Sequence, residues 1–166
     1  EKMYRRVASR HRDADGKMPQ HTFFWYWSDE GDQKGIEYLK RLAHLSYDGY
    51  GEVELHLHHD DDTEETVRVD LERRIRLSQK TGAFITAGEE PKTTYAFIHG
   101  MWALDNSRDG RYCGVNKELK VLRESGCYAD FTHSSWGTMN PRIANSLYYA
   151  KDDPHPKSYD IGRKVE

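Results

Sequence analysis

The segment with the densest potential for metal chemistry is residues 56–62. It reads His-Leu-His-His-Asp-Asp-Asp and places three imidazoles and three carboxylates within seven positions. Neutral imidazole and carboxylate are common ligands of Zn²⁺ and similar ions. His58 and Asp62 are four positions apart, one at the end of a strand pattern and one at the start of a helix pattern. We expect them to bind one ion; the structural alternative is a solvated acidic loop in which Asp62 only caps the helix.

Two further reactive residues stand at the ends of apolar runs. His99 closes one run and precedes Gly100, whose missing side chain lets a ligand or backbone approach closely. Asp130 closes a second apolar run and is followed by Phe131. Apolar surroundings of this kind shift the pKa of a carboxyl group. We predict that both are catalytic, as acid–base or substrate-binding groups. The alternatives are a hydrogen-bonded core histidine and, for Asp130, an ion pair with Arg108 or Arg123.

The polar loop of residues 101–112 and the aromatic content both favour a saccharide ligand. The chain has 11 Tyr, 5 Phe and 4 Trp, and aromatic faces stack on sugar rings. In the loop, Trp102 is a candidate stacking platform, and Asp105 and Asn106 offer groups that bond sugar hydroxyls. His133 is close enough in sequence to the acidic strand end to join the same site. An ordinary turn, with the tryptophan as a lid over the core, is the structural alternative.

Length and charge exclude several classes of protein. The 166 residues carry 25 Lys and Arg against 28 Asp and Glu, a net charge of -3, whereas a nucleic-acid surface normally needs a basic excess. No run approaches the ~20 apolar residues that span a bilayer, and no signal-peptide pattern opens the chain. We therefore expect one domain over residues 1–166, with no nucleic-acid partner and no membrane span, and favour the cytoplasm. The chain starts at Glu1, so its N-terminus is processed, truncated or incompletely recorded.

Cys113 and Cys127 are the two cysteines of the chain. A disulfide framework in a small secreted protein would normally use more. We favour free buried thiols, and a single bridge between the two stays open. The sequence contains neither a glycine-rich phosphate loop nor a serine nucleophile elbow.

The periodicity of apolar residues predicts alternating strands and helices. Period-two or continuous apolar runs predict strands near the following ranges: 21–27, 52–58, 94–99, 127–131 and 143–149. The first is expected to be buried on both faces. Helical spacing lies between them. This alternation predicts an α/β fold with a parallel sheet and right-handed crossovers, in which ligands bind beyond the carboxyl ends of the strands.

Three blocks of sequence resemble a branch of the polysaccharide deacetylase (NodB-homology) superfamily. They are residues 49–60, 97–107 and 126–132. The resemblance covers roughly residues 20–150. It implies a distorted (β/α) barrel, a divalent metal, often zinc, held by one Asp and two His, and removal of acetyl groups from saccharides. Because a full barrel takes ~250 residues, the resemblance implies a partial or trimmed barrel here.

Within this resemblance, the family's pair of histidines four positions apart corresponds to His58 and Asp62, so carboxylate replaces the second imidazole. The family's arginine–proline motif falls where His99 stands, and its later acidic position falls near Asp130. Its aspartate pair on the opening strand has no match. Either that strand lies upstream of Glu1, or this branch has lost the catalytic base.

Together these patterns predict a metal-dependent hydrolase that removes acetyl groups from a saccharide with the help of a divalent ion, zinc by preference. A non-catalytic carbohydrate-binding or assembly protein on the same scaffold is the alternative, because fold does not fix function.

Overall fold

The computed structural model describes residues 1–28, 32–84, 93–103, 105–132, 143, 146–155 and 161–166. Its elements follow in the order α1 (Lys2–Ala8), β1 (His21–Tyr26), α2 (Gln33–Tyr47), β2 (Gly51–Leu57), α3 (Glu64–Gln79), β3 (Tyr95–His99), the short 3₁₀ turn η1 (Gly100–Trp102), α4 (Glu118–Ser125), β4 (Cys127–Asp130), β5 (Tyr148–Ala150) and β6 (Gly162–Lys164).

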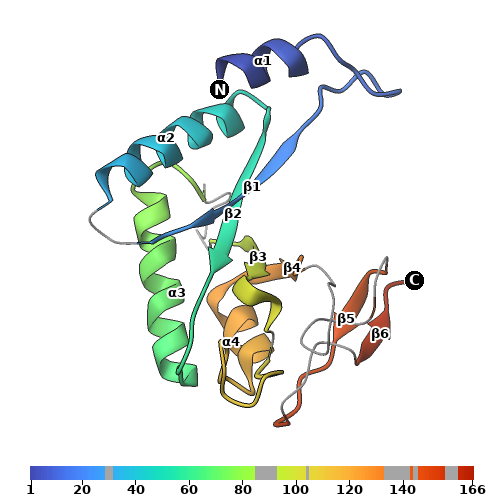
Figure 1. The fold of residues 1–166 in the computed structure, drawn as a ribbon. Helices are drawn as coiled ribbons and strands as arrows, with labels where there is room; N and C mark the ends of the chain where they lie inside the picture. The colour runs from blue at the N-terminus through green and yellow to red at the C-terminus, as the bar shows by residue number, and fades with distance from the viewer. Residues whose placement is uncertain (29–31, 85–92, 104, 133–142, 144–145, 156–160) are drawn as a thin grey trace.

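The centre of the fold is a four-stranded sheet in the order β1-β2-β3-β4. All three neighbouring pairs are parallel, and a helix separates each strand from the next (Figure 1). This confirms the predicted parallel βα fold, and the four strands lie within a residue or two of the predicted ranges. Closure of the sheet into a barrel stays a prediction.

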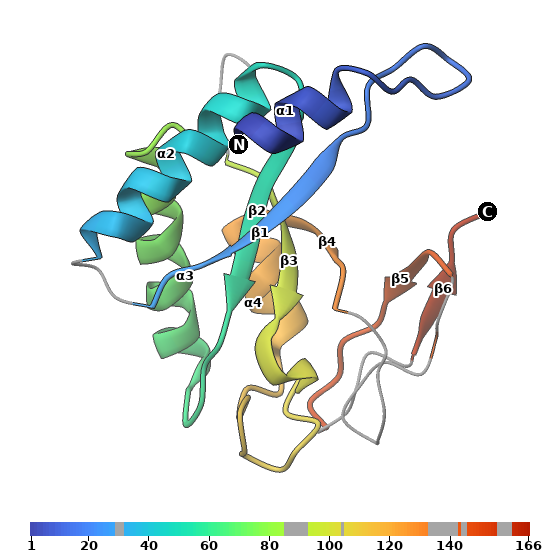
Figure 2. The same ribbon diagram turned by 45° about the horizontal axis from the view of Figure 1, so that its top comes forward.

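The hydrophobic core lies between this sheet and its helices. In Figure 2, α3 and α4 lie behind the sheet, and α2 packs against β2. Strand alternation sends Leu55 and Leu57 of β2 into this core, next to Phe97 of β3. Val67 and Leu71 of α3 pack against them from the helix side. Consequently the alternate side chains of β2 face the side of the sheet that these helices do not cover.

Two strand predictions need correction. The first strand, expected to be buried on both faces, is half-buried over most of its length, because β1 is an edge strand with helices on one side. The predicted strand at 143–149 instead begins at Tyr148 and pairs antiparallel with β6 in a separate two-stranded sheet. Its ladder is extended by the bond from Lys151 N–H to the Ile161 carbonyl, at 2.8 Å. A short local hairpin is therefore formed in place of another βα unit.

Glu54 is a buried carboxyl group on the less covered face of β2. Its Oε2 accepts a hydrogen bond from the backbone N–H of Ala96 at 2.5 Å, and the Tyr128 hydroxyl donates to its Oε1 at 3.2 Å. Burial raises the pKa of Glu54 to about 7, although these two hydrogen bonds work in the opposite direction. Folding therefore favours the protonated form of this side chain.

The pH dependence of stability tests this assignment. Because the folded-state pKa of Glu54 lies above its ordinary value, its contribution to stability is present below pH ~4.5 and is lost as the pH rises through 7, by about 3 kcal/mol. Urea unfolding at pH 5 and pH 8 should show Glu54→Gln gaining stability relative to the parent at pH 8. Glu65→Gln, at an exposed position in the first turn of α3, is the control. Identical pH profiles for the parent and Glu54→Gln would contradict the assignment.

Candidate metal centre

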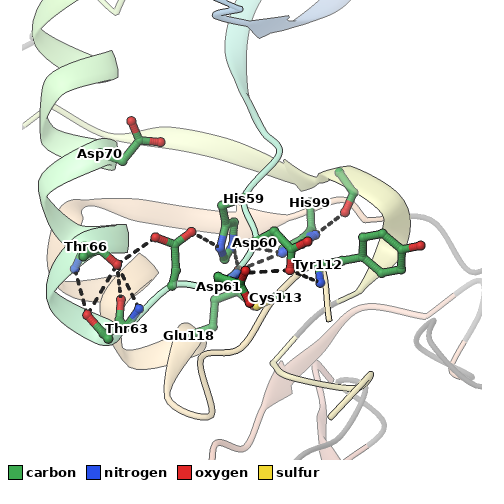
Figure 3. Close-up of polar contacts among 12 residues, drawn as sticks. His59, Asp60, Asp61, Thr63, Thr66, Asp70, His99, Tyr112, Cys113 and Glu118 are labelled. Atoms are coloured by element: carbon green, nitrogen blue, oxygen red, sulfur yellow. Dashed lines mark hydrogen bonds and ion pairs between the residues drawn. The ribbon is translucent and has the colours of Figure 1, made fainter. Parts of the chain in front are cut away.

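Four side chains that can bind a metal ion converge beyond the carboxyl ends of β2 and β3. They are His59, His99, Cys113 and Glu118, and one ligand atom of each lies within 4.8 Å of all the others (Figure 3). We call this group the buried cluster. Among the residues that the structure describes, this is the one group of three or more such side chains whose ligand atoms lie this close together.

The donor atoms of the buried cluster have the spacing that one small ion requires. The two imidazole Nε2 atoms, of His59 and His99, are 3.0 Å apart. Glu118 Oε1 lies 3.1 Å from the first and 3.2 Å from the second. In a tetrahedral zinc site with bonds of about 2.0–2.1 Å, nitrogen and oxygen donors are separated by about 3.3 Å. Cys113 Sγ contacts the other carboxylate oxygen, Glu118 Oε2, at 3.0 Å and belongs to the group because the four ligand atoms lie within 4.8 Å of one another.

Each of the four side chains is placed by a different element. His59 follows the end of β2 by two residues, and His99 is the last residue of β3. These strands are parallel neighbours, so their carboxyl ends meet. Cys113 comes at the end of the loop formed by residues 101–112, and Glu118 opens α4. The cluster therefore forms where two strand ends, one loop and one helix start coincide.

Hydrogen bonds set the orientation of both rings. The Nδ1 of His99 contacts the carbonyl of Gly100, and a carbonyl only accepts, so Nδ1 carries the proton. The Nδ1 of His59 lies 3.1 Å from Oδ2 of Asp62, which accepts in the same way. In their neutral forms, which a bound ion requires, both rings therefore turn an Nε2 lone pair toward the cluster. Metal-binding histidines in proteins are oriented by such partners.

The electrostatics of the cluster favour a negatively charged Glu118. Burial alone would raise the pKa of this carboxyl group, but His99 and His59 outweigh burial and hold its pKa well below the ordinary value. The reverse holds for His99: burial lowers its pKa, and the Glu118 charge more than offsets this and raises it. A proton on the imidazole therefore balances the buried carboxylate when no ion is present, and a divalent cation would replace that proton.

Cys113 is a thiol in this arrangement and donates to Glu118. Burial, followed by the charge of Glu118, raises the pKa of Cys113 far above the ordinary value. Backbone hydrogen bonds from Asn106 and Val115 act in the opposite direction. The surroundings thus stabilise a thiolate only if a cation offsets the neighbouring carboxylate.

The loop that delivers Cys113 has an unusual backbone. Six of its residues other than glycine have φ between 49° and 65°, in the left-handed region: Met101, Trp102, Asp105, Asn106, Asp109 and Tyr112. Each such residue costs about 1 kcal/mol or more, and such residues gather at functional sites. The loop is tied to the cluster by the N–H of Asp105, which donates to Glu118 Oε2 at 2.7 Å. This bond compensates part of the cost.

The predicted ligands His58 and Asp62 do not meet in the structure. The exposed imidazole of His58 lies 2.9 Å from the Nε2 of His56, outside the buried cluster. The carboxylate of Asp62 instead bonds the ring of the neighbouring His59. Asp62 is not the helix cap either, since Thr63 caps α3. Successive residues of an extended chain point to opposite sides, so the two adjacent histidines serve different faces of the sheet.

The predicted catalytic residues lie close to the cluster in different roles. His99 belongs to it. Asp130 lies beside Phe97 in the register of β3 and β4, and its Oδ1 accepts from Thr132 N–H at 2.6 Å. Its Oδ2 is buried and accepts no hydrogen bond from any described residue. Burial raises the pKa of Asp130 to about 6, which agrees with the perturbed pKa expected from its apolar surroundings.

The predicted sugar-binding residues divide into two groups. Trp102 is 43% exposed and free to face a ligand. Asp105 and Asn106 are buried, and the carboxamide of Asn106 donates to Asn116 within the same loop at 2.7 Å. These two therefore shape the loop instead of facing solvent. His133 lies outside the described residues.

No member of the buried cluster was predicted as a metal ligand: His99 was predicted as a catalytic group, and the other three were not predicted as site residues. His59 was visible among the strand-end histidines, but the spacing favoured its neighbour. Cys113 was interpreted as an ordinary free thiol, which agrees with the two free cysteines of the structure. Glu118 carried no recognised motif. Its one signal is an acidic residue in the first turn of a helix whose next turn begins with two buried apolar residues, Val121 and Leu122.

No family model, curated protein or solved structure matches this chain. Within the described part of the chain, no helix has both the length and the apolar character needed to cross a membrane.

The role of Asp62 as a positioning residue gives a direct prediction. Asp62→Asn removes the carboxylate that orients the His59 ring, so zinc affinity should fall by about 10- to 100-fold. Competition with a chromophoric chelator measures this affinity. Asp61→Asn is the matched control, because Asp61 is exposed and has a φ of 54° that asparagine tolerates. Equal zinc affinities for Asp62→Asn and Asp61→Asn would contradict the role.

Proposed function

We propose that this chain is a metal-dependent hydrolase acting on carbohydrate, and that its reaction is the deacetylation of an acetylated saccharide. The observation that carries the proposal is the buried cluster of His59, His99, Cys113 and Glu118 at the carboxyl edge of a parallel sheet. Ligands of such sheets bind at this edge. The resemblance of three sequence blocks to polysaccharide deacetylases suggests the acetyl group as the target, although it places the metal on His58 and Asp62 and not on this cluster.

The donor set fits zinc. Two imidazole nitrogens, a thiol sulfur and a carboxylate oxygen are the ligand types of Zn²⁺ sites, whereas Ca²⁺ and Mg²⁺ prefer oxygen alone. A carboxylate as buried as Glu118 also requires a compensating charge. We therefore assign zinc to His59, His99, Cys113 and Glu118.

A bound zinc ion would supply Lewis acidity toward an acyl carbonyl and lower the pKa of a water molecule, provided that the ion accepts a ligand beyond the four protein donors. Among the chain's own groups, Asp130 is suited to hold and release the proton. Its pKa is raised to about 6, and an acid–base group works best when its pKa is near the working pH. Its buried Oδ2, without a hydrogen-bond partner among the described residues, is the atom at which that proton would reside.

Exposed aromatic side chains support a saccharide as the substrate. Trp102 follows the strand-end histidine by three residues, Phe131 directly follows Asp130, and Tyr26 ends β1. Their exposed fractions are 43%, 53% and 41%. Because strand ends meet at one edge of a parallel sheet, these rings lie at the edge that carries the cluster. Stacking on sugar rings is a common use of such faces.

One observation favours a non-catalytic carbohydrate-binding or assembly protein as the second candidate. The side chains of His59, His99 and Glu118 are at most 4% exposed. Structural zinc sites are closed by four protein ligands, whereas catalytic sites keep one position open. In this alternative the zinc stabilises the fold, and glycan binding is separate from it.

Metal content and acetate release, measured together, test the proposed function. The purified chain should contain zinc and release acetate from acetylated oligosaccharides, and chelation should abolish that release. Cys113→Ser and His99→Ala should each lose the zinc of the buried cluster together with the activity, because each removes one donor. His44→Ala, an exposed position on α2, should change neither.

The outcomes separate the two candidates. Acetate release that survives chelation would show that the hydrolase does not depend on a metal. Zinc without acetate release, combined with glycan binding that persists in Cys113→Ser, would favour the binding protein.

A further inference from the structure

A second pair of imidazoles lies on the face of the sheet opposite the buried cluster. In the register of β2 and β3, Leu57 pairs with His99 on the core face, and His56 pairs with Ile98 on the other. The ring of His58 joins His56 on that second face: the two Nε2 atoms are 2.9 Å apart, and the ring planes meet at 89°. The two histidine pairs are therefore separated by the strand itself.

The orientation of His56 is set by the backbone of β3. Its Nδ1 lies 2.8 Å from the carbonyl of Ile98. A carbonyl only accepts, so Nδ1 carries the proton and the neutral ring has its lone pair on Nε2. That lone pair points at the Nε2 of His58. If neutral His58 carries its proton on Nδ1, its Nε2 lone pair is free as well. Both Nε2 lone pairs can then bind one ion placed between the two rings.

The position of His58 depends on Gly100. A Cβ at residue 100 would lie 2.4 Å from Cγ of the His58 ring, so only glycine leaves room for the imidazole. The ring of Tyr26 meets His58 edge-on at 5.0 Å and His56 at 5.9 Å between centroids. Two neighbours thus hold the rings in place, and His58 remains exposed to solvent. The pair is preorganised and accessible.

We propose that His56 and His58 form a second site for a divalent transition metal, distinct from the buried cluster. Imidazole nitrogen selects ions such as Zn²⁺ and Cu²⁺. An ion with bonds of about 2.0–2.1 Å to both Nε2 atoms separates them by about 3.3 Å, a few tenths of an ångström more than the 2.9 Å observed. Because His58 is exposed, the site is accessible to water or to an anionic ligand.

One cationic side chain bears on the affinity of this site. The guanidinium of Arg74 lies 5.5 Å from the centroid of the Tyr26 ring. Its Nε forms an ion pair with Asp70 at 2.7 Å, which offsets its charge. With two protein ligands, the site binds zinc more weakly than the four-ligand cluster, and the two should fill in sequence as zinc is added.

Zinc stoichiometry of the full chain tests the proposal. Equilibrium dialysis against Zn²⁺ with elemental analysis should give two ions per chain for the parent. His58→Ala and His56→Ala should each bind one ion fewer, and His44→Ala should match the parent. His58 is exposed, so its loss removes no core packing, and far-ultraviolet circular dichroism verifies the fold of each variant.

Cobalt distinguishes this site from the buried cluster. In the chain loaded with Co²⁺, the near-ultraviolet sulfur-to-cobalt band should remain in His58→Ala and disappear in Cys113→Ser. Zinc content that is the same in the parent, His56→Ala and His58→Ala would overturn the proposal. An ion that persists in Cys113→Ser and disappears on adding His58→Ala would support this site even if the buried cluster held no metal.

Discussion

Burial of the Glu118 carboxylate is the constraint around which this edge of the molecule is arranged. The side chain has no exposure to solvent, and an uncompensated charge at such a depth would cost several kcal/mol. The imidazoles of His59 and His99 approach one of its oxygens, and the Cys113 thiol and a backbone N–H approach the other. The start of α4 must therefore sit against the ends of β2 and β3, whether a proton or a cation supplies the positive charge.

The same constraint accounts for the neighbouring loops. Several residues between His99 and Cys113 adopt the left-handed backbone conformation. This conformation brings the Cys113 thiol back to the cluster. Asp62 orients the His59 ring and is itself bonded at 2.7 Å by the Thr66 hydroxyl from the first turn of α3. The start of α3 is thereby linked to the cluster. Local strain and polar burial are both explained by a site that gathers donors from separate elements.

Local patterns in the sequence were sufficient to predict the sheet but not the full site. Alternation in β2 and the strand-end position of His99 follow from residue periodicity, so both were predictable. The choice between His58 and His59 was not, because it depends on the direction in which the chain leaves the strand. Cys113 and Glu118 join the cluster through packing of a strained loop and of α4 against strands distant in sequence, and no spacing rule encodes that packing.

Binding of one zinc ion within the buried cluster can be measured by X-ray absorption at the zinc edge. The full chain, loaded with one equivalent of zinc, should fill the four-ligand cluster first. We expect a first coordination shell with one sulfur at about 2.3 Å and three nitrogen or oxygen atoms at about 2.0–2.1 Å. A shell of nitrogen and oxygen alone, with no sulfur from Cys113, would contradict it.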